Sequence, residues 1–350
     1  MIKFPILKKL WLILVEAYIN MGFLFYYQKI DVHYIEKIPK NKAVLFLSNH
    51  QNALLDPLII TVNSTRKNYF LTRADVFSNK FISSILNSLQ MLPVYRVRDG
   101  IRTITKNKKI FSTCSEILHQ NKSIILFPEG NHSLKRSVRD LSKGFTRIVE
   151  DFLNTNQNHE LVIVPVGLNY QSPRAYGDRV SIYFGNHIDP LNFMNSENDV
   201  DIQQLKACVQ YHLKELTTHF EMDDNYESTI EKLNALKVDY TNPKLIKECV
   251  NNQFKYKGKH VKRNSGWYNI FRFLTILIYS LPFFIWKIRV VPTIKEDEFI
   301  GTMRFATIIS IAPIFLVLEI LLIAILFGTI YGLIGLLIAL IIPLITLRVK

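Results

Sequence analysis

The feature that most constrains this chain is a pair of long apolar stretches near its C-terminal end. Residues 305–327 contain one charged side chain, Glu319, and residues 331–347 contain none. At about 1.5 Å per helical residue, the first stretch can cross a hydrocarbon layer about 30 Å thick, and the second has about the minimum length. Because a short glycine-containing break separates them, we expect a transmembrane helical hairpin over residues 305–347.

Two further segments are apolar but interrupted by polar residues. Residues 270–286 contain Arg272 and Pro282, so this segment is either a short span or a helix lying in the membrane interface. Residues 10–27 carry a narrow polar stripe at helical spacing. We therefore expect residues 1–30 to form an N-terminal helix at the membrane interface.

The charge of the chain points to the same environment. The net charge is +14 and 49% of the residues are apolar, a combination that suits an anionic membrane surface. A nucleic-acid binder would explain the charge but not the apolar stretches. Arg304 precedes the expected hairpin, and Arg348 and Lys350 follow it, so the positive-inside rule predicts that the rest of the chain faces the cytoplasm.

Between the terminal segments, short apolar runs alternate with helical patterns, which predicts an α/β sheet with helices packed on it. We expect a main domain over residues 31–222, a helical basic linker over 223–266 and a membrane region over 267–350. The expected strands cover residues 32–35, 44–47, 69–71, 92–95, 124–127, 161–169 and 180–184. The expected helices cover residues 57–62, 81–89, 101–120, 144–153, 201–220, 226–236 and 243–252.

The first candidate site follows the apolar run at residues 43–47, where the chain continues Ser-Asn-His-Gln-Asn-Ala-Leu-Leu-Asp and so places His50 six residues before Asp56. A histidine and an aspartate in one polar loop suit a general base and the carboxylate that orients it. Residues six apart on a helix are separated by about 120°, so the intervening loop must fold back for the two side chains to meet. The alternative is that Asp56 only caps a helix that begins at Pro57.

A second block follows another apolar run, where Phe-Pro-Glu-Gly places Glu129 and Gly130 after the strand at residues 124–127. Together the two blocks resemble the first and third signature blocks of the glycerolipid acyltransferases, over roughly residues 31–185. That family usually has four residues between the histidine and the aspartate, whereas this chain has five. The resemblance implies an acyltransferase-type mixed sheet flanked by helices.

The resemblance also implies roles for individual residues. His50 and Asp56 would be catalytic, with no enzyme nucleophile. Arg96, at the place of the second block, would bind the acceptor phosphate, and Glu129 would bind acceptor hydroxyl groups. Gly130 would allow close backbone approach, and Asn49 and Lys143 are further candidates for substrate binding.

The implied activity is that of a membrane-bound O-acyltransferase, in which acyl-CoA or acyl carrier protein donates a fatty acyl group to glycerol 3-phosphate or 1-acylglycerol 3-phosphate. Open alternatives are an aminolipid or another lysolipid as acceptor, and a catalytically silent membrane tether on the same fold. The expected partners are membrane lipid, the acyl donor and the phosphorylated acceptor, without nucleic acid, metal or cofactor. The C-terminal region is expected to supply membrane attachment and no chemistry. Acceptor, chain length, acyl carrier and oligomeric state remain open.

Overall fold

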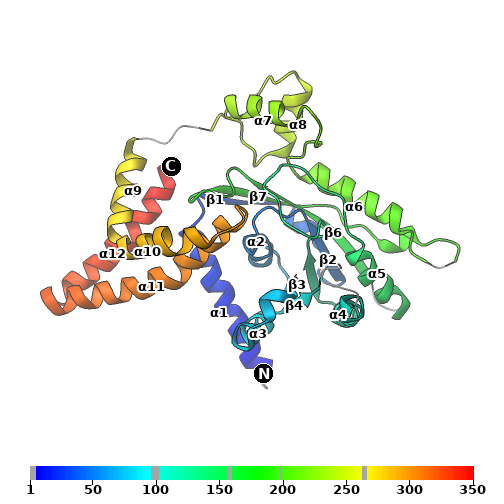
Figure 1. Ribbon diagram of the computed structural model, residues 1–350, viewed down its shortest axis with the longest axis horizontal. Coiled ribbons are helices and arrows are strands. Elements are labelled where there is room, and N and C mark those ends of the chain that lie inside the picture. Colours follow the sequence, from blue (N-terminus) through cyan, green and yellow to red (C-terminus); the bar gives the residue numbers. More distant parts are fainter. Residues whose placement is uncertain (1–4, 96–101, 156–159, 198, 262–265) are drawn as a thin grey trace.

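The structure, a computed structural model, describes residues 5–95, 102–155, 160–197, 199–261 and 266–350 (Figure 1). Within these residues a seven-stranded sheet has the order β1-β7-β6-β2-β5-β3-β4. All neighbouring strands are parallel except β6 and β7, so the sheet is mixed, and all seven expected strands are confirmed. The strands are β1 (Lys29–His33), β2 (Ala43–Ser48), β3 (Asn68–Arg73), β4 (Met91–Val94), β5 (Ser123–Leu126), β6 (Leu161–Tyr170) and β7 (Arg179–Phe184).

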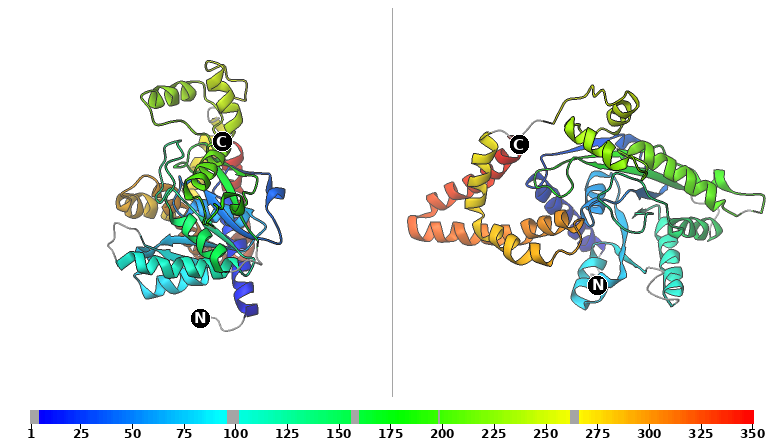
Figure 2. Two further views of the ribbon diagram at one scale, coloured as in Figure 1. Left: turned by 90° about the vertical axis from the view of Figure 1, so that its right-hand side faces the viewer. Right: turned by 45° about the horizontal axis from the view of Figure 1, so that its top comes forward.

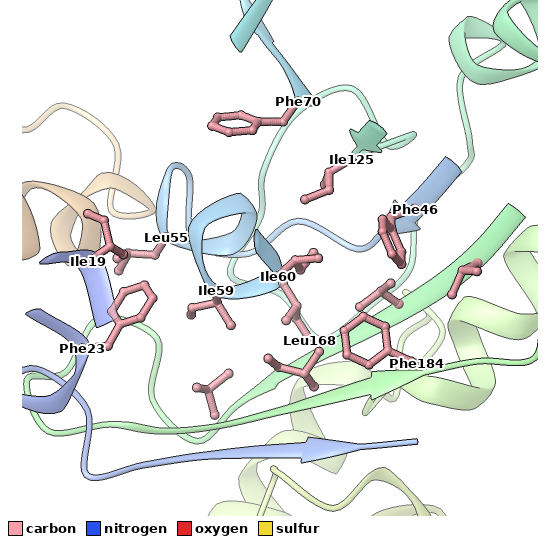
Figure 3. Packing of buried hydrophobic residues seen from close by; sticks show 14 of the residues in the cluster. Ile19, Phe23, Phe46, Leu55, Ile59, Ile60, Phe70, Ile125, Leu168 and Phe184 are labelled. Carbon is pink, nitrogen blue, oxygen red and sulfur yellow. The ribbon is translucent and has the colours of Figure 1, made fainter. Parts of the chain in front are cut away.

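Helices cover both faces of the sheet, because successive side chains of β2 point to opposite faces and are buried on both. Val44 and Phe46 belong to one buried cluster, and Leu45 and Leu47 belong to the other. The first cluster is covered by α1 (Pro5–Leu24), α2 (Leu55–Asn63) and α11 (Phe299–Phe327), and the second by α4 (Arg102–Leu118), α5 (Gly144–Thr155) and α6 (Ile202–Leu216). Figure 3 shows Phe23 of α1 beside α2 in the first cluster.

Side chains at the helix ends mark where several helices begin. Asn79 accepts hydrogen bonds from two backbone N–H groups at the start of α3 (Lys80–Ser88), and Asp201 does the same for α6. Such caps satisfy donors that have no partner within the helix. The short, polar capping residues therefore explain why the expected helices begin within a residue or two of their observed starts.

The segment expected as a linker is folded. It contains α7 (Tyr226–Ala235) and α8 (Pro243–Asn251), which share a small core that includes Leu233 and Ile246. An ion pair of 2.7 Å joins Asp239 to Arg179 at the start of β7. Figure 1 shows these two helices beside the end of the sheet where β6 and β7 pair.

The C-terminal region contains two helices that are long and apolar enough to cross a membrane, α11 and α12 (Thr329–Arg348). They lie side by side and extend away from the sheet (Figures 1 and 2). Gly328 joins them at a φ of 103°, in the left-handed region that favours glycine. The expected hairpin is therefore present, although α11 begins at Phe299, six residues before the expected start.

The apolar segment at residues 270–286 is bent. It forms α9 (Gly266–Ile278) and α10 (Ser280–Ile285), and α9 meets the helical run Ser280–Thr293, which α10 begins, at 93°. The Thr275 hydroxyl of α9 lies 2.8 Å from the Thr346 hydroxyl of α12, and Tyr279 donates to the Ala339 carbonyl oxygen at 3.1 Å. Since α9 packs along α12, the segment folds against the hairpin.

Both ends of the hairpin contact the main domain. At the start of α11, the Phe305 ring lies 4.9 Å from Phe23 and 5.3 Å from Tyr26, between ring centroids. After α12, the Lys350 ammonium donates to the carbonyl oxygens of Tyr176 and Gly177 at 2.5 and 2.7 Å. The hairpin therefore leaves the domain and returns to it.

Candidate active site

The loop between β2 and α2 brings His50 and Asp56 together. The Nδ1 atom of His50 lies 2.7 Å from Oδ2 of Asp56. Asp56 is fully buried, whereas the His50 side chain retains 14% of its exposure. The fold-back expected from their spacing is present, and the imidazole reaches the surface while its partner does not.

Three further donors hold the Asp56 carboxylate. The backbone N–H groups of Gln51 and Asn52 each donate to Oδ2 at 2.8 Å, and the Tyr170 hydroxyl donates to Oδ1 at 2.5 Å. The interpretation of Asp56 as a helix cap is wrong, because α2 already begins at Leu55 and the carboxylate accepts from the loop before the helix. This network fixes the carboxylate and, through it, the proton on Nδ1 of His50.

Tyr170 was not found from the sequence. It ends β6, a strand that is buried along its whole length, and a tyrosine in such an apolar run gives no local sign of a polar role. Burial, reinforced by the charge of Asp56, raises the pKa of Tyr170 well above its usual value. The hydroxyl therefore keeps its proton and donates to the carboxylate.

Two aromatic rings hold the imidazole of His50. The Phe127 ring stacks on it at 4.0 Å between centroids, and the His132 ring meets it edge-to-face at 5.5 Å. The backbone N–H of Ser133 donates to the His50 carbonyl oxygen at 2.9 Å, which ties the loop after β5 to the loop after β2. With Nδ1 occupied by Asp56, Nε2 is the ring nitrogen left for a substrate proton.

Glu129 lies in the same site, and Arg139 holds it. Arg139 donates to Oε2 of Glu129 from Nε at 2.9 Å and also from Nη2. Burial raises the pKa of Glu129, while the Arg139 charge opposes that shift. Oε1 is buried and has no hydrogen-bond partner among the described residues, and Glu129 shares a small polar cavity with His50. The free oxygen suits the predicted contact with an acceptor hydroxyl; Arg139 was missed from the sequence.

Other predicted binding residues have different surroundings. Both polar atoms of the Asn49 amide bond the Leu168 backbone, at 3.0 and 2.8 Å, so this side chain joins the loop to β6. Gly130 has a φ of 78° with no protein atom within 4 Å of an added Cβ, and Lys143 is exposed just before α5. Arg96 lies outside the described residues. The substrate-binding roles of these four residues remain predictions.

The start of α11 packs on the catalytic loop, which the sequence did not indicate. Thr302 donates to the Asn52 carbonyl oxygen at 3.4 Å, and Tyr26 of α1 donates to the Gly301 carbonyl oxygen at 3.1 Å. A Cβ added at Gly301 would lie 2.6 Å from Oδ1 of Asn52 and 3.0 Å from the Pro173 carbonyl oxygen. The first turn of α11 therefore contacts the catalytic loop, and the expectation that the C-terminal region supplies no chemistry stays a prediction.

An apolar cavity of about 250 Å³ opens beside this loop. It lies between α1, α2, α11 and the edge of the sheet at β3 and β4. Among its lining residues are Ile13, Ile19, Leu55, Leu58, Phe70 and Phe305. Because Leu55 directly precedes Asp56 in the chain, the cavity adjoins the catalytic loop.

Comparison with known proteins covers the part of the chain that carries this site. Residues 29–169 match the sequence model of the family described as Acyltransferase. This part of the chain is similar to an acyltransferase domain. The match confirms the resemblance based on the blocks at His50 and Glu129, and it includes both of them.

Two known proteins resemble this chain. A probable 1-acyl-sn-glycerol-3-phosphate acyltransferase of Mycoplasma pneumoniae is 25% identical over 189 residues, covering 49% of this chain. The chain spans 64% of the length of that relative. The crystal structure of the 1-acyl-sn-glycerophosphate acyltransferase from Thermotoga maritima aligns with a TM-score of 0.44 and 19% identity, over 61% of this chain and 83% of the other.

Proposed function

We propose that the protein is a membrane-bound O-acyltransferase of phospholipid synthesis. In this proposal it transfers a fatty acyl group from an acyl thioester, acyl-CoA or acyl carrier protein, to a hydroxyl of glycerol 3-phosphate or 1-acylglycerol 3-phosphate. The observation that carries the proposal is the buried, four-fold hydrogen-bonded Asp56 behind a His50 imidazole that reaches the surface. A catalytically silent tether would have no need of this arrangement.

The chemistry follows from the geometry of that pair. Nε2 of His50 takes the proton from the acceptor hydroxyl as its oxygen attacks the thioester carbonyl carbon. Asp56 holds the imidazole in the required tautomer and stabilises the charged form. A carbon–oxygen bond forms, the carbon–sulfur bond breaks, and the proton passes from Nε2 to the departing sulfur. Glu129, through its free Oε1, orients the acceptor by a hydrogen bond to a second hydroxyl.

The surroundings of the pair support a lipid substrate. The apolar cavity between α1, α2 and α11 suits an acyl chain, because burying each methylene group contributes about 0.8 kcal/mol. Exposed apolar residues on α1 and on the hairpin suit contact with a membrane. Both ends of the hairpin meet the domain, so one side of the membrane would hold the site, and the basic flanks favour the cytoplasmic side.

The experiment is an assay of the purified full chain in detergent, with acyl-CoA and acyl carrier protein thioesters and a panel of phosphorylated, neutral and amino acceptors. We expect transfer to a phosphorylated glycerol, and His50→Ala should lower the rate by about 10² to 10⁴, the usual effect of removing a general base. His187→Ala, which changes an exposed histidine, is the matched control. A folded His50→Ala protein with wild-type turnover would disprove the mechanism.

The acceptor is tested separately. Arg96→Ala and Lys143→Ala should raise the Michaelis constant for a phosphorylated acceptor more than for a neutral one, because their proposed partner is the phosphate. Equal losses on both acceptors would show that these residues do not bind phosphate. Preferred transfer to an aminolipid would replace the acceptor in this proposal and keep the catalytic pair.

A further inference from the structure

The histidine beside the catalytic pair has an unused nitrogen. His132 keeps only 10% of its side-chain exposure, and its Nε2 atom is buried with no hydrogen-bond partner among the described residues. Leaving a buried polar atom unpaired costs about 1–3 kcal/mol. His132 is packed on both sides, edge-to-face against Phe299 at 4.7 Å and against His50 at 5.5 Å, so the ring cannot turn away freely.

Two carboxylates from the chain leading into α11 approach that nitrogen. An oxygen of Glu296 lies 4.0 Å from Nε2, and the ligand atoms of His132, Glu296 and Glu298 all lie within 4.8 Å of one another. Like charges at this separation repel unless a positive charge lies between them. Asp297, the residue between the two glutamates, pairs instead with Arg174. The two glutamates of this turn therefore lie near His132, and its aspartate lies against Arg174.

We propose that His132, Glu296 and Glu298 bind one divalent transition-metal cation beside the catalytic histidine. One imidazole and two carboxylates suit Zn²⁺ or Mn²⁺, whereas Mg²⁺ and Ca²⁺ take oxygen ligands. Zn²⁺ at about 2.0–2.2 Å from each ligand places tetrahedral ligands about 3.4 Å apart. The 4.0 Å separation reaches that value by a small rotation of Glu296, whose side chain is 58% exposed.

Such a cation would join two parts of the protein that are distant in sequence. His132 belongs to the loop after β5, and the glutamates belong to the lead into the C-terminal hairpin. The cation would fasten the hairpin to the acyltransferase domain and place positive charge within reach of the His50 site. This inference concerns binding and stability, and it holds whichever acceptor the enzyme uses.

The test is metal binding by the purified full chain in detergent, without a histidine tag and stripped of metal with a chelator. Zn²⁺ is titrated against a chromophoric chelator, and bound Mn²⁺ is measured from the electron paramagnetic resonance signal of the free ion. We expect one cation per chain and a rise in the melting temperature, since a ligand that binds the folded state stabilises it. No binding, or binding without any rise, would overturn the proposal.

Single substitutions test which residues bind the cation. Glu298→Gln and His132→Ala should each weaken binding by at least about tenfold, the lower end of what the loss of an outer partner already costs. Asp297→Asn lies on the same turn and pairs with Arg174, so it should bind the cation as the wild type does. Because Glu298 is only partly buried and glutamine keeps its size, the result of Glu298→Gln does not depend on the tolerance of the core to His132→Ala. Unchanged affinity in Glu298→Gln would refute the assignment.

Discussion

Gly301 is the point at which the C-terminal hairpin contacts the catalytic loop. In Gly301→Ala the new Cβ would lie 2.6 Å from Oδ1 of Asn52, whereas an ordinary carbon–oxygen contact is about 3.3 Å or longer. The loop or the helix must therefore move by about 0.7 Å. Asn52 cannot yield easily, since its amide donates to the Pro173 carbonyl oxygen at 2.9 Å, and that oxygen lies only 3.0 Å from the new atom.

The expected effect on stability is small, while the effect on catalysis is large. Alanine gains about 1 kcal/mol over glycine within a helix, and overpacking costs about 1–3 kcal/mol, so the net loss is about 0–2 kcal/mol. The backbone N–H of Asn52 donates to Asp56, so a shift of the loop moves the carboxylate that orients His50. A misplacement of about 1 Å can cost about 10² in rate, and we expect a fall in kcat of about tenfold or more.

The assay measures release of free thiol from an acyl thioester, with kcat and KM determined separately and the melting temperature measured in parallel. The control is Gly335→Ala in α12, where the nearest atom to the new Cβ is a methyl group of Ile323 at 3.4 Å. Adding Asn52→Ala to Gly301→Ala removes one of the clashing groups and should restore part of the rate. Wild-type kcat in a folded Gly301→Ala protein would refute the view that the hairpin positions the catalytic loop.

Four further predictions follow from other parts of the structure. Tyr170→Phe removes a donor from the buried Asp56 and should lower both kcat and stability, the latter by about 1–3 kcal/mol in thermal or denaturant unfolding. Truncation after Gly266 should abolish acyl transfer but release the protein only partly from membranes, and added salt should increase the release. Full release at low salt would show that the hairpin is the sole anchor. Glu319→Gln should retain activity and membrane insertion, because Oε2 of Glu319 has no hydrogen-bond partner among the described residues. Loss of transfer with normal insertion would give Glu319 a functional role. Burial raises the pKa of Asp178 to about 7 from 3.8, so the folded chain holds this proton more tightly than the unfolded chain. The free energy of unfolding should therefore fall as the pH rises from about 4 to about 7. Asp178→Asn should remove this dependence in thermal melts at several pH values.

The local pattern of the sequence was enough for the elements and for the core of the site. Short apolar runs, such as residues 43–47, predicted the strands because a buried strand must place apolar side chains on both faces of the sheet. His50 and Asp56 were found because they lie only six residues apart, directly after an apolar run. The two apolar stretches predicted the hairpin because their length and lack of charge leave few other solutions.

Contacts between distant segments could not be predicted in this way. Tyr170 reaches Asp56 from 114 residues away, and Thr302 reaches Asn52 from 250 residues away. Neither residue carries a local signal, since a tyrosine at the end of a buried strand and a threonine at the start of an apolar helix are ordinary core and membrane residues. Their roles depend on which strand pairs beside β2 and on the side of the sheet to which α11 returns. Packing decides both. The apolar pattern of one helix or strand shows which of its own faces is buried, but not which other element packs against that face.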